Sequence, residues 1–133
     1  MLLSLLNDEE KRYFIDLLNR IVLADGEKTK KETVLFETLR GELQIGEGYK
    51  FSTRSLDTLI NYFAKKDLAV KKLVYMNLAS ISLIEDFYRV EVHMIMEKIQ
   101  EKFALSDKDK KELLKIVYAE RDIKEKAKRV IHE

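Results

Sequence analysis

The sequence predicts an all-α fold, a single-domain helical bundle of about six to seven helices. Apolar residues recur at spacings of three and four along most of the chain, which is the period of an amphipathic helix. Proline is absent, so no helix has to end at a residue that lacks an amide proton. No pair of alternating apolar and polar runs flanks an Asn-Gly or Asp-Gly turn, so a strand assignment has no support.

Glycines and capping residues mark the ends of six predicted helices. Five of them span about residues 8–24, 30–45, 68–84, 89–103 and 107 to the C-terminus, and the third is a shorter helix that carries Leu56, Leu59, Ile60 and Phe63. Asn7 or Asp8 caps the first helix, and the apolar residues before it form a short lead-in that we expect to pack on the core. Gly26 separates the first two helices, and residues 46–50 form the longest predicted loop.

The other helices begin at recognisable N-caps. Thr29 followed by Glu32 has the spacing of a capping box for the second helix. A serine within residues 52–55 caps the third helix, and Asp67 caps the fourth. Ser106 opens the last helix in a similar pattern.

The helix over residues 68–84 differs from the others because residues 73–84 carry no charge. A helix that is apolar nearly all round is buried nearly all round. Its small residues, such as Ala79, Ser80 and Ser82, allow neighbouring helices to approach closely. We therefore predict that it is the central helix of the bundle.

Two parts of the sequence also match each other in their pattern of apolar and acidic residues. When it is aligned so that Asp25 falls on Glu85, Leu39 falls on Ile99 and the surrounding apolar positions match. Each copy consists of an apolar helix, an acidic turn and an amphipathic helix. This pattern predicts an internal duplication, with two imperfect helix–acidic turn–helix halves around the central helix.

Composition excludes several classes of function. The 25 Lys and Arg residues balance 24 Asp and Glu residues, so the charge gives no reason to expect a nucleic acid as partner. The absence of cysteine excludes disulfides, thiolate metal sites and thiol catalysis. No apolar run is long enough for an integral membrane segment, and acids follow the lead-in at once, which no secretory signal has. We expect a cytoplasmic protein.

The acidic turns are the candidate site for a divalent cation such as calcium or magnesium, because these ions take oxygen ligands. If the two turns lie together, their carboxylates share an ion. The candidate ligands are Asp25, Glu32, Glu85, Asp86 and Glu91. The alternative is that these residues only cap helices, since Gly26 suits a helix C-terminus and Thr29 with Glu32 suits an N-terminus.

These residues also carry a family resemblance. Ala24-Asp25-Gly26, with Glu32 seven residues after the aspartate and an apolar helix face behind it, resembles the TerB-like family, named for a tellurite-resistance protein. The fold also forms a domain of a DnaJ-like co-chaperone. The resemblance covers about residues 8–118 and implies an all-helical bundle of two such halves. It further implies a stress-response role and a functional or metal-binding role for Asp25 and Glu32. The second turn departs from the pattern, because Phe87 follows Asp86 where the family has glycine.

Residues 119–133, the C-terminal extension, form an amphipathic helical segment with lysines around apolar positions. We expect it to pack back on its own bundle, with lysine stems covering apolar surface. Docking on a protein partner, a second subunit or a membrane surface is the alternative.

Catalysis finds little support in the residue inventory. The chain has two histidines, His93 and His132, and neither has the spacing of a di-iron motif. No nucleophile elbow, phosphate loop or dinucleotide fingerprint occurs. We therefore expect a non-catalytic binding or scaffold module with a divalent-cation site. The alternative is a metal-free protein interaction or dimerisation module.

Overall fold

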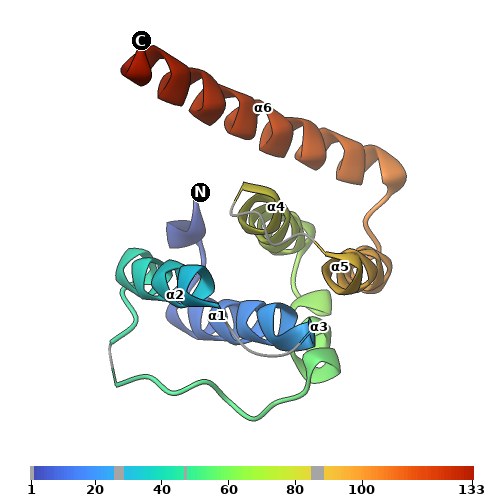
Figure 1. Cartoon of the computed structure of the whole chain (residues 1–133). Coiled ribbons are helices and arrows are strands. Elements are labelled where there is room, and N and C mark those ends of the chain that lie inside the picture. The colour runs from blue at the N-terminus through green and yellow to red at the C-terminus, as the bar shows by residue number, and fades with distance from the viewer. Residues whose placement is uncertain (1, 26–28, 47, 85–88) are drawn as a thin grey trace.

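The computed structural model of the chain describes residues 2–25, 29–46, 48–84 and 89–133, with only the backbone of residues 25 and 84. These residues form helices and no strand, which confirms the predicted all-α fold (Figure 1). The α-helices are α1 (Asp8–Val22), α2 (Lys30–Leu43), α3 (Leu56–Ala64), α4 (Leu68–Ile84), α5 (Val90–Lys102) and α6 (Asp107–His132). Two short 3₁₀ helices, η1 (Leu3–Leu5) and η2 (Leu23–Asp25), flank α1.

The helices begin where their capping residues predict. Asn7 Oδ1 accepts a hydrogen bond from Glu10 N at 2.8 Å, and Glu10 Oε1 accepts one from Asn7 N at 2.9 Å, which makes a complete capping box for α1. The caps of α3, α4 and α6 each accept one bond from a backbone amide, and they are Ser55, Asp67 and Ser106. Local sequence therefore fixes the start of these helices.

The central position of α4 is confirmed. It contacts α3, α5 and α6, and no residue from 73 to 83 is exposed. Two of its buried polar side chains bond to its own backbone, with Asn77 Nδ2 donating to Leu73 O at 2.8 Å and Ser82 Oγ donating to Leu78 O at 2.7 Å. These bonds lower the cost of burying polar groups among apolar neighbours.

On the other side of the bundle, α1 contacts α2, α3 and α5. Leu3 and Leu6 of the N-terminal lead-in are buried, as predicted. Between α1 and α3, the rings of Tyr13 and Tyr62 stack with centroids 3.6 Å apart and planes 11° apart. The charged groups of Arg54 and Lys66 lie over these two rings, which extends the stack at both ends.

The loop between α2 and α3 is longer than predicted, and its described residues are 44–46 and 48–55. Gln44 ends α2 in the left-handed conformation, at φ 57°. Ile45 then packs against the core although the chain there is irregular. The capping serine of α3 is the last of the candidate serines, Ser55, so the described residues between α2 and this serine lie outside a helix.

The expectation that the C-terminal extension packs back on its own bundle is wrong. The first half of α6 lies on α4, where Val117 is buried, but residues 122–133 are all exposed. No glycine or proline occurs after Gly48, so nothing in the sequence breaks α6 and lets the chain turn back. Figure 1 shows its C-terminal end pointing away from the other helices. Within the described residues, no helix is long and apolar enough to cross a membrane.

Candidate functional site

The first acidic turn contains the predicted capping box. Thr29 N donates to Glu32 Oε1 at 3.3 Å, and Glu32 N donates to Thr29 Oγ1 at 3.2 Å. Glu32 is only 3% exposed, and its other oxygen, Oε2, accepts no hydrogen bond from any described residue. A buried carboxylate of this kind needs a compensating positive charge nearby.

Arg89 supplies that charge from the start of α5. Its Nη2 atom lies 3.8 Å from Glu32 Oε2 and 3.5 Å from the carbonyl oxygen of Val22, at the end of α1. The N-terminus of α5 and the N-terminus of α2 are therefore neighbours. A cation bound to Glu32 Oε2 has to compete with this guanidinium group.

The remaining candidate ligands are distributed differently. Glu91 lies in the first turn of α5 and is exposed. The side chain of Asp25, together with Glu85 and Asp86, lies outside the described residues. In the described ranges, no three acidic or histidine side chains lie close enough together to hold a metal ion. The cation site of the acidic turns stays a prediction.

His93 has a partner on its own helix. Its Nε2 atom lies 3.0 Å from Glu97 Oε1, one turn later on the exposed face of α5. Both side chains lie at the rim of a small pocket of about 250 Å³ between α4, α5 and α6. Apart from the His93–Glu97 pair, the residues that line this pocket are mainly apolar.

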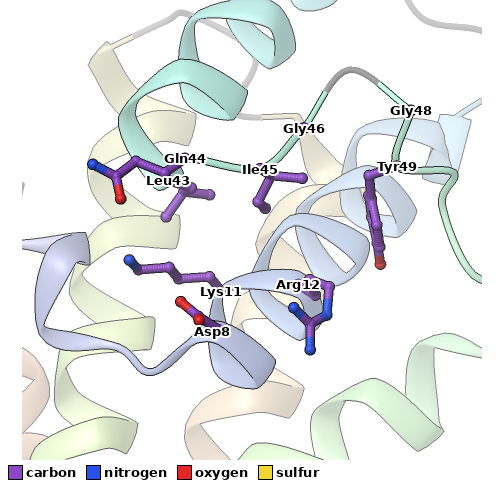
Figure 2. Close-up of a pocket in the computed structure, with 9 residues that line it drawn as sticks. All are labelled: Asp8, Lys11, Arg12, Leu43, Gln44, Ile45, Gly46, Gly48 and Tyr49. Atoms are coloured by element: carbon purple, nitrogen blue, oxygen red, sulfur yellow. The ribbon is translucent and has the colours of Figure 1, made fainter.

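A larger pocket of about 530 Å³ lies between the N-terminus of α1 and the loop after α2 (Figure 2). Its charged side chains are Asp8, Lys11 and Arg12, and Tyr49 forms part of the opposite wall. Because an acid stands beside the two bases, the pocket does not select a ligand of one charge. At the start of α1, the backbone amide of Glu10 is already bonded to Asn7 Oδ1.

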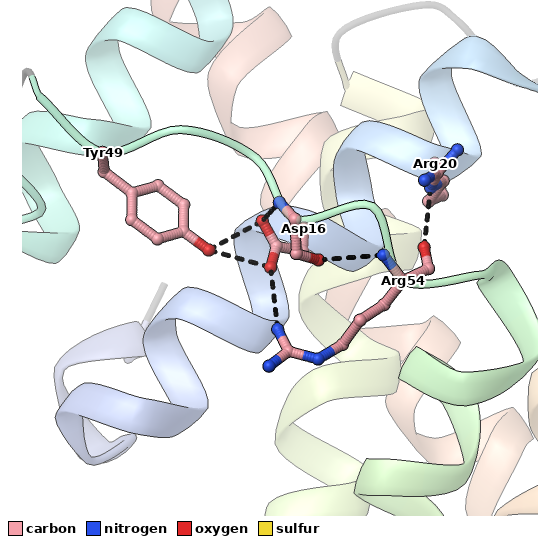
Figure 3. Close-up of polar contacts among 5 residues, drawn as sticks. Asp16, Arg20, Tyr49 and Arg54 are labelled. Atoms are coloured by element: carbon pink, nitrogen blue, oxygen red, sulfur yellow. Dashed lines mark hydrogen bonds and ion pairs between the residues drawn. The ribbon is translucent and has the colours of Figure 1, made fainter.

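A buried carboxylate that the sequence pattern does not reveal organises the loop between α2 and α3. Asp16, in the middle of α1, is 2% exposed (Figure 3). Tyr49 Oη lies 2.8 Å from both of its oxygens, and Ser52 N donates to Oδ1 at 3.3 Å. An Arg54 nitrogen lies 4.0 Å from Oδ2. Burial, together with the hydrogen bond to Asp16, raises the pKa of Tyr49, so this hydroxyl remains a donor.

Two further arginines hold the same loop through its backbone. Arg40 Nη1 donates to Tyr49 O at 2.9 Å, and Arg20 Nε donates to Arg54 O at 2.9 Å. Arg40 also lies over the ring of Phe51, 5.1 Å from its centroid. Asp16 lies opposite the apolar face of α1, so helical periodicity does not reveal it. Its burial depends on a loop that only the fold brings over it.

The exposed half of α6 carries the clearest surface feature of the molecule. Ile116, Ile123 and Val130 are 54%, 68% and 60% exposed, and they follow one another at intervals of seven residues. Ala119 and Ala127 lie between them and are also exposed. At about 100° per residue these five side chains form one line along the helix, which we name the α6 stripe.

The α6 stripe lies on a different side of the helix from the bundle contacts. Three consecutive residues show this, because each is turned by about 100° from the one before. Val117 is buried against the core, and Tyr118 lines the pocket shared with α5. Ile116 points to the other side and is exposed. The stripe is therefore open even where α6 lies on the bundle.

No protein-family model, no curated protein and no solved structure matches this chain, so its function is inferred from the contacts and surfaces described above.

Proposed function

We propose that this chain is a non-catalytic protein interaction module, in which a helical bundle presents the α6 stripe to a protein partner. The observation that carries the proposal is the row of three large apolar side chains that are more than half exposed on one line of α6. Scattered apolar residues on a surface are ordinary, but an ordered row on a projecting helix is typical of a docking face.

The C-terminal extension is suited to binding because it is already helical. Within it, ion pairs between side chains one turn apart, Lys124 with Glu120 at 3.6 Å and Lys128 with Glu125 at 3.3 Å, add about 0.2–0.5 kcal/mol each to the helix. A helix formed before binding lowers the ordering cost that a partner has to offset.

The charges beside the stripe favour a protein over a membrane. Glu120 and Asp122 flank Ile123 on its two sides, together with Lys124 and Lys126. A helix that binds anionic lipid carries mainly lysine and arginine on the face next to its apolar residues. Acids in these positions are repelled by lipid phosphate, whereas a protein surface can pair with both signs.

The test is the native size of the chain in an extract of the cells that produce it. The wild-type chain is expected to elute above its own mass of 15.7 kDa. Ile123→Asp places a charge in the centre of the stripe and is expected to return the chain to monomer size. Lys128→Asp, on the opposite face, is the matched control and is expected to elute as wild type. Elution of all three chains as monomers, or recovery of the wild-type chain with membranes, contradicts the proposal.

A second candidate, a TerB-like scaffold with a divalent cation at its acidic turns, is supported by Glu32. This carboxylate is buried, one of its oxygens has no hydrogen-bond donor among the described residues, and it lies where the starts of α2 and α5 meet. Thermal unfolding after chelation, with and without calcium or magnesium, tests it. A bound ion at about a hundred times its dissociation constant stabilises the fold by about 2.7 kcal/mol. Loss of that stabilisation in Asp25→Asn identifies the ligand, and no shift with any ion leaves Glu32 as a cap.

A further inference from the structure

We infer that the partner of the α6 stripe is a second copy of this chain, bound antiparallel, with a twofold axis passing beside Ile123. This inference rests on the proposed function and identifies its partner. An interface between identical chains around a twofold axis has to be complementary to itself. Both the apolar residues and the charges of the C-terminal extension meet that condition.

The apolar residues of the stripe are symmetric about Ile123. Ala119 and Ala127 are each four residues from it, and Ile116 and Val130 are each seven residues from it. In an antiparallel pair centred on Ile123, each side chain lies at the level of its counterpart in the other copy. The large side chain of Ile116 therefore lies opposite Val130 of the second copy. The small side chain of Ala119 lies opposite Ala127. Facing alanines allow the helix backbones to approach closely.

The charges determine the orientation of the two helices. At about 100° per residue, Glu120 and Lys124 lie on one side of the stripe, and Asp122 and Lys126 lie on the other. Antiparallel pairing brings residues of the same side together, so Glu120 faces Lys124 of the second copy, and Asp122 faces Lys126. Parallel pairing brings opposite sides together and places acid against acid and base against base. The antiparallel arrangement is the one with complementary charges.

The pairing surface is open along its length. Ile116, at one end, is exposed on the side of α6 away from the pocket shared with α5, so the C-terminal end of a second α6 has room beside it. Pairing over residues 116–130 corresponds to about 21 Å of helix. Such a contact is small for a protein interface, so we expect a reversible dimer with a dissociation constant on the order of micromolar.

The absence of cysteine from the chain gives a direct geometric test. Ile123→Cys places a thiol beside the axis, next to the same thiol of the second copy. Val130→Cys places its two thiols about 21 Å apart in the antiparallel pair, too far for a disulfide. Under mild oxidation of the purified full-length variants, Ile123→Cys is expected to form a disulfide-linked dimer at least ten times faster than Val130→Cys. Lys128→Cys, on the opposite face, sets the rate for random collision.

Each result of this experiment has a definite meaning. Equally fast linkage through positions 123 and 130 contradicts the antiparallel arrangement and indicates a parallel pair. Rates for all three variants that equal the collision rate show that the stripe does not pair with a second copy.

A charge exchange provides the second test, by sedimentation equilibrium of the purified chain. Glu120→Lys places lysine against Lys124 of the second copy and is expected to weaken the dimer at least tenfold. Adding Lys124→Glu restores one acid and one base on that side and is expected to recover affinity to within about threefold. Circular dichroism checks that both variants keep their helix content. Failure of the second substitution to rescue contradicts the proposed facing charges.

The two proposals fail in different ways. A purified chain that is monomeric at all concentrations, combined with a large complex in extract that Ile123→Asp removes, rejects the second copy and supports a different protein partner. A monomer in both settings rejects both proposals. Binding of the monomeric purified chain to vesicles containing phosphatidylserine also rejects both, in favour of a membrane surface.

Discussion

The described part of the loop between α2 and α3 and the C-terminal extension contrast in a way that secondary structure alone does not reveal. The loop is irregular, yet it is bonded to α1 through Asp16 and Arg20 and to α2 through Arg40. The extension is regular helix, yet its last twelve residues, 122–133, are all exposed. Regular backbone hydrogen bonding and attachment to the core are separate properties of a segment.

The difference arises from how each segment satisfies its polar backbone groups. A helix bonds its amides and carbonyls internally and can continue past the core by adding one bond per residue. An irregular loop has no such internal partners, so it needs side chains from elsewhere. The loop is therefore expected to be sensitive to substitution of its anchors, and the extension to be insensitive to loss of its own residues.

The largest effect is expected for Asp16→Ala. It leaves the Tyr49 hydroxyl and the Ser52 amide without their buried acceptor, which costs about 2–4 kcal/mol of unfolding free energy. Urea unfolding of the purified chain measures the change. Glu125→Ala, at an exposed acid in the extension on the face opposite the α6 stripe, is the control, with an expected change within about 0.5 kcal/mol. Similar losses of unfolding free energy for both variants contradict the view that the loop is anchored to the core and the extension is not.

Tyr49→Phe removes one donor to Asp16 and is expected to cost about 2 kcal/mol near neutral pH. It also changes the response to alkali. The pKa of Tyr49 is raised above its ordinary value of 10.0, so above that pH the unfolded chain loses this proton while the folded chain keeps it. Wild-type stability therefore falls as the pH rises beyond 10.0, and the variant, which lacks this group, falls less steeply. Parallel slopes in urea titrations across this range contradict the role of the hydroxyl.

Ser106→Ala tests the attached end of α6. The serine accepts a hydrogen bond from Asp109 N at 3.0 Å, and its loss is expected to cost about 1 kcal/mol in thermal unfolding. Lys108→Ala, at an exposed neighbour, serves as the control and is expected to leave the midpoint nearly unchanged. A larger effect of the lysine variant shows that side-chain packing, and not the cap, secures the start of α6.

Removing residues 122–133 is expected to have the smallest effect. At low protein concentration, where the chain is monomeric, the free energy of unfolding changes by less than about 0.5 kcal/mol, because these residues contact no core. Urea unfolding of the shortened and full-length chains measures it. A decrease of more than about 1 kcal/mol in the free energy of unfolding indicates that the extension stabilises the fold of its own chain.

The helices were predictable from sequence because their signals are local. The caps Asn7, Thr29 and Ser106 and the charge-free stretch over residues 73–84 each act over a few residues. The loop anchor Asp16 was not predictable, since its partners are 33 and 36 positions away in the sequence. The course of the extension was predicted wrongly. An amphipathic pattern shows that one face of a helix is stabilised by burial. It does not show whether the surface that buries this face belongs to the same chain.

The candidate site was predictable only in part. Glu32 has the expected capping bonds, whereas its neighbour Arg89 was not foreseen, because the contact depends on how the starts of α2 and α5 pack. The cation site and the TerB-like resemblance stay predictions.

The stacked rings of Tyr13 and Tyr62 have an optical consequence. The chain has no tryptophan, so its six tyrosines and six phenylalanines produce all of its near-ultraviolet spectrum. With centroids 3.6 Å apart, the electronic transitions of this pair couple and give a circular dichroism signal that isolated tyrosines lack. One ring belongs to α1 and the other to α3, so the molecule carries an intrinsic reporter of whether these two helices are in contact. The signal disappears when they separate, even if both remain helical.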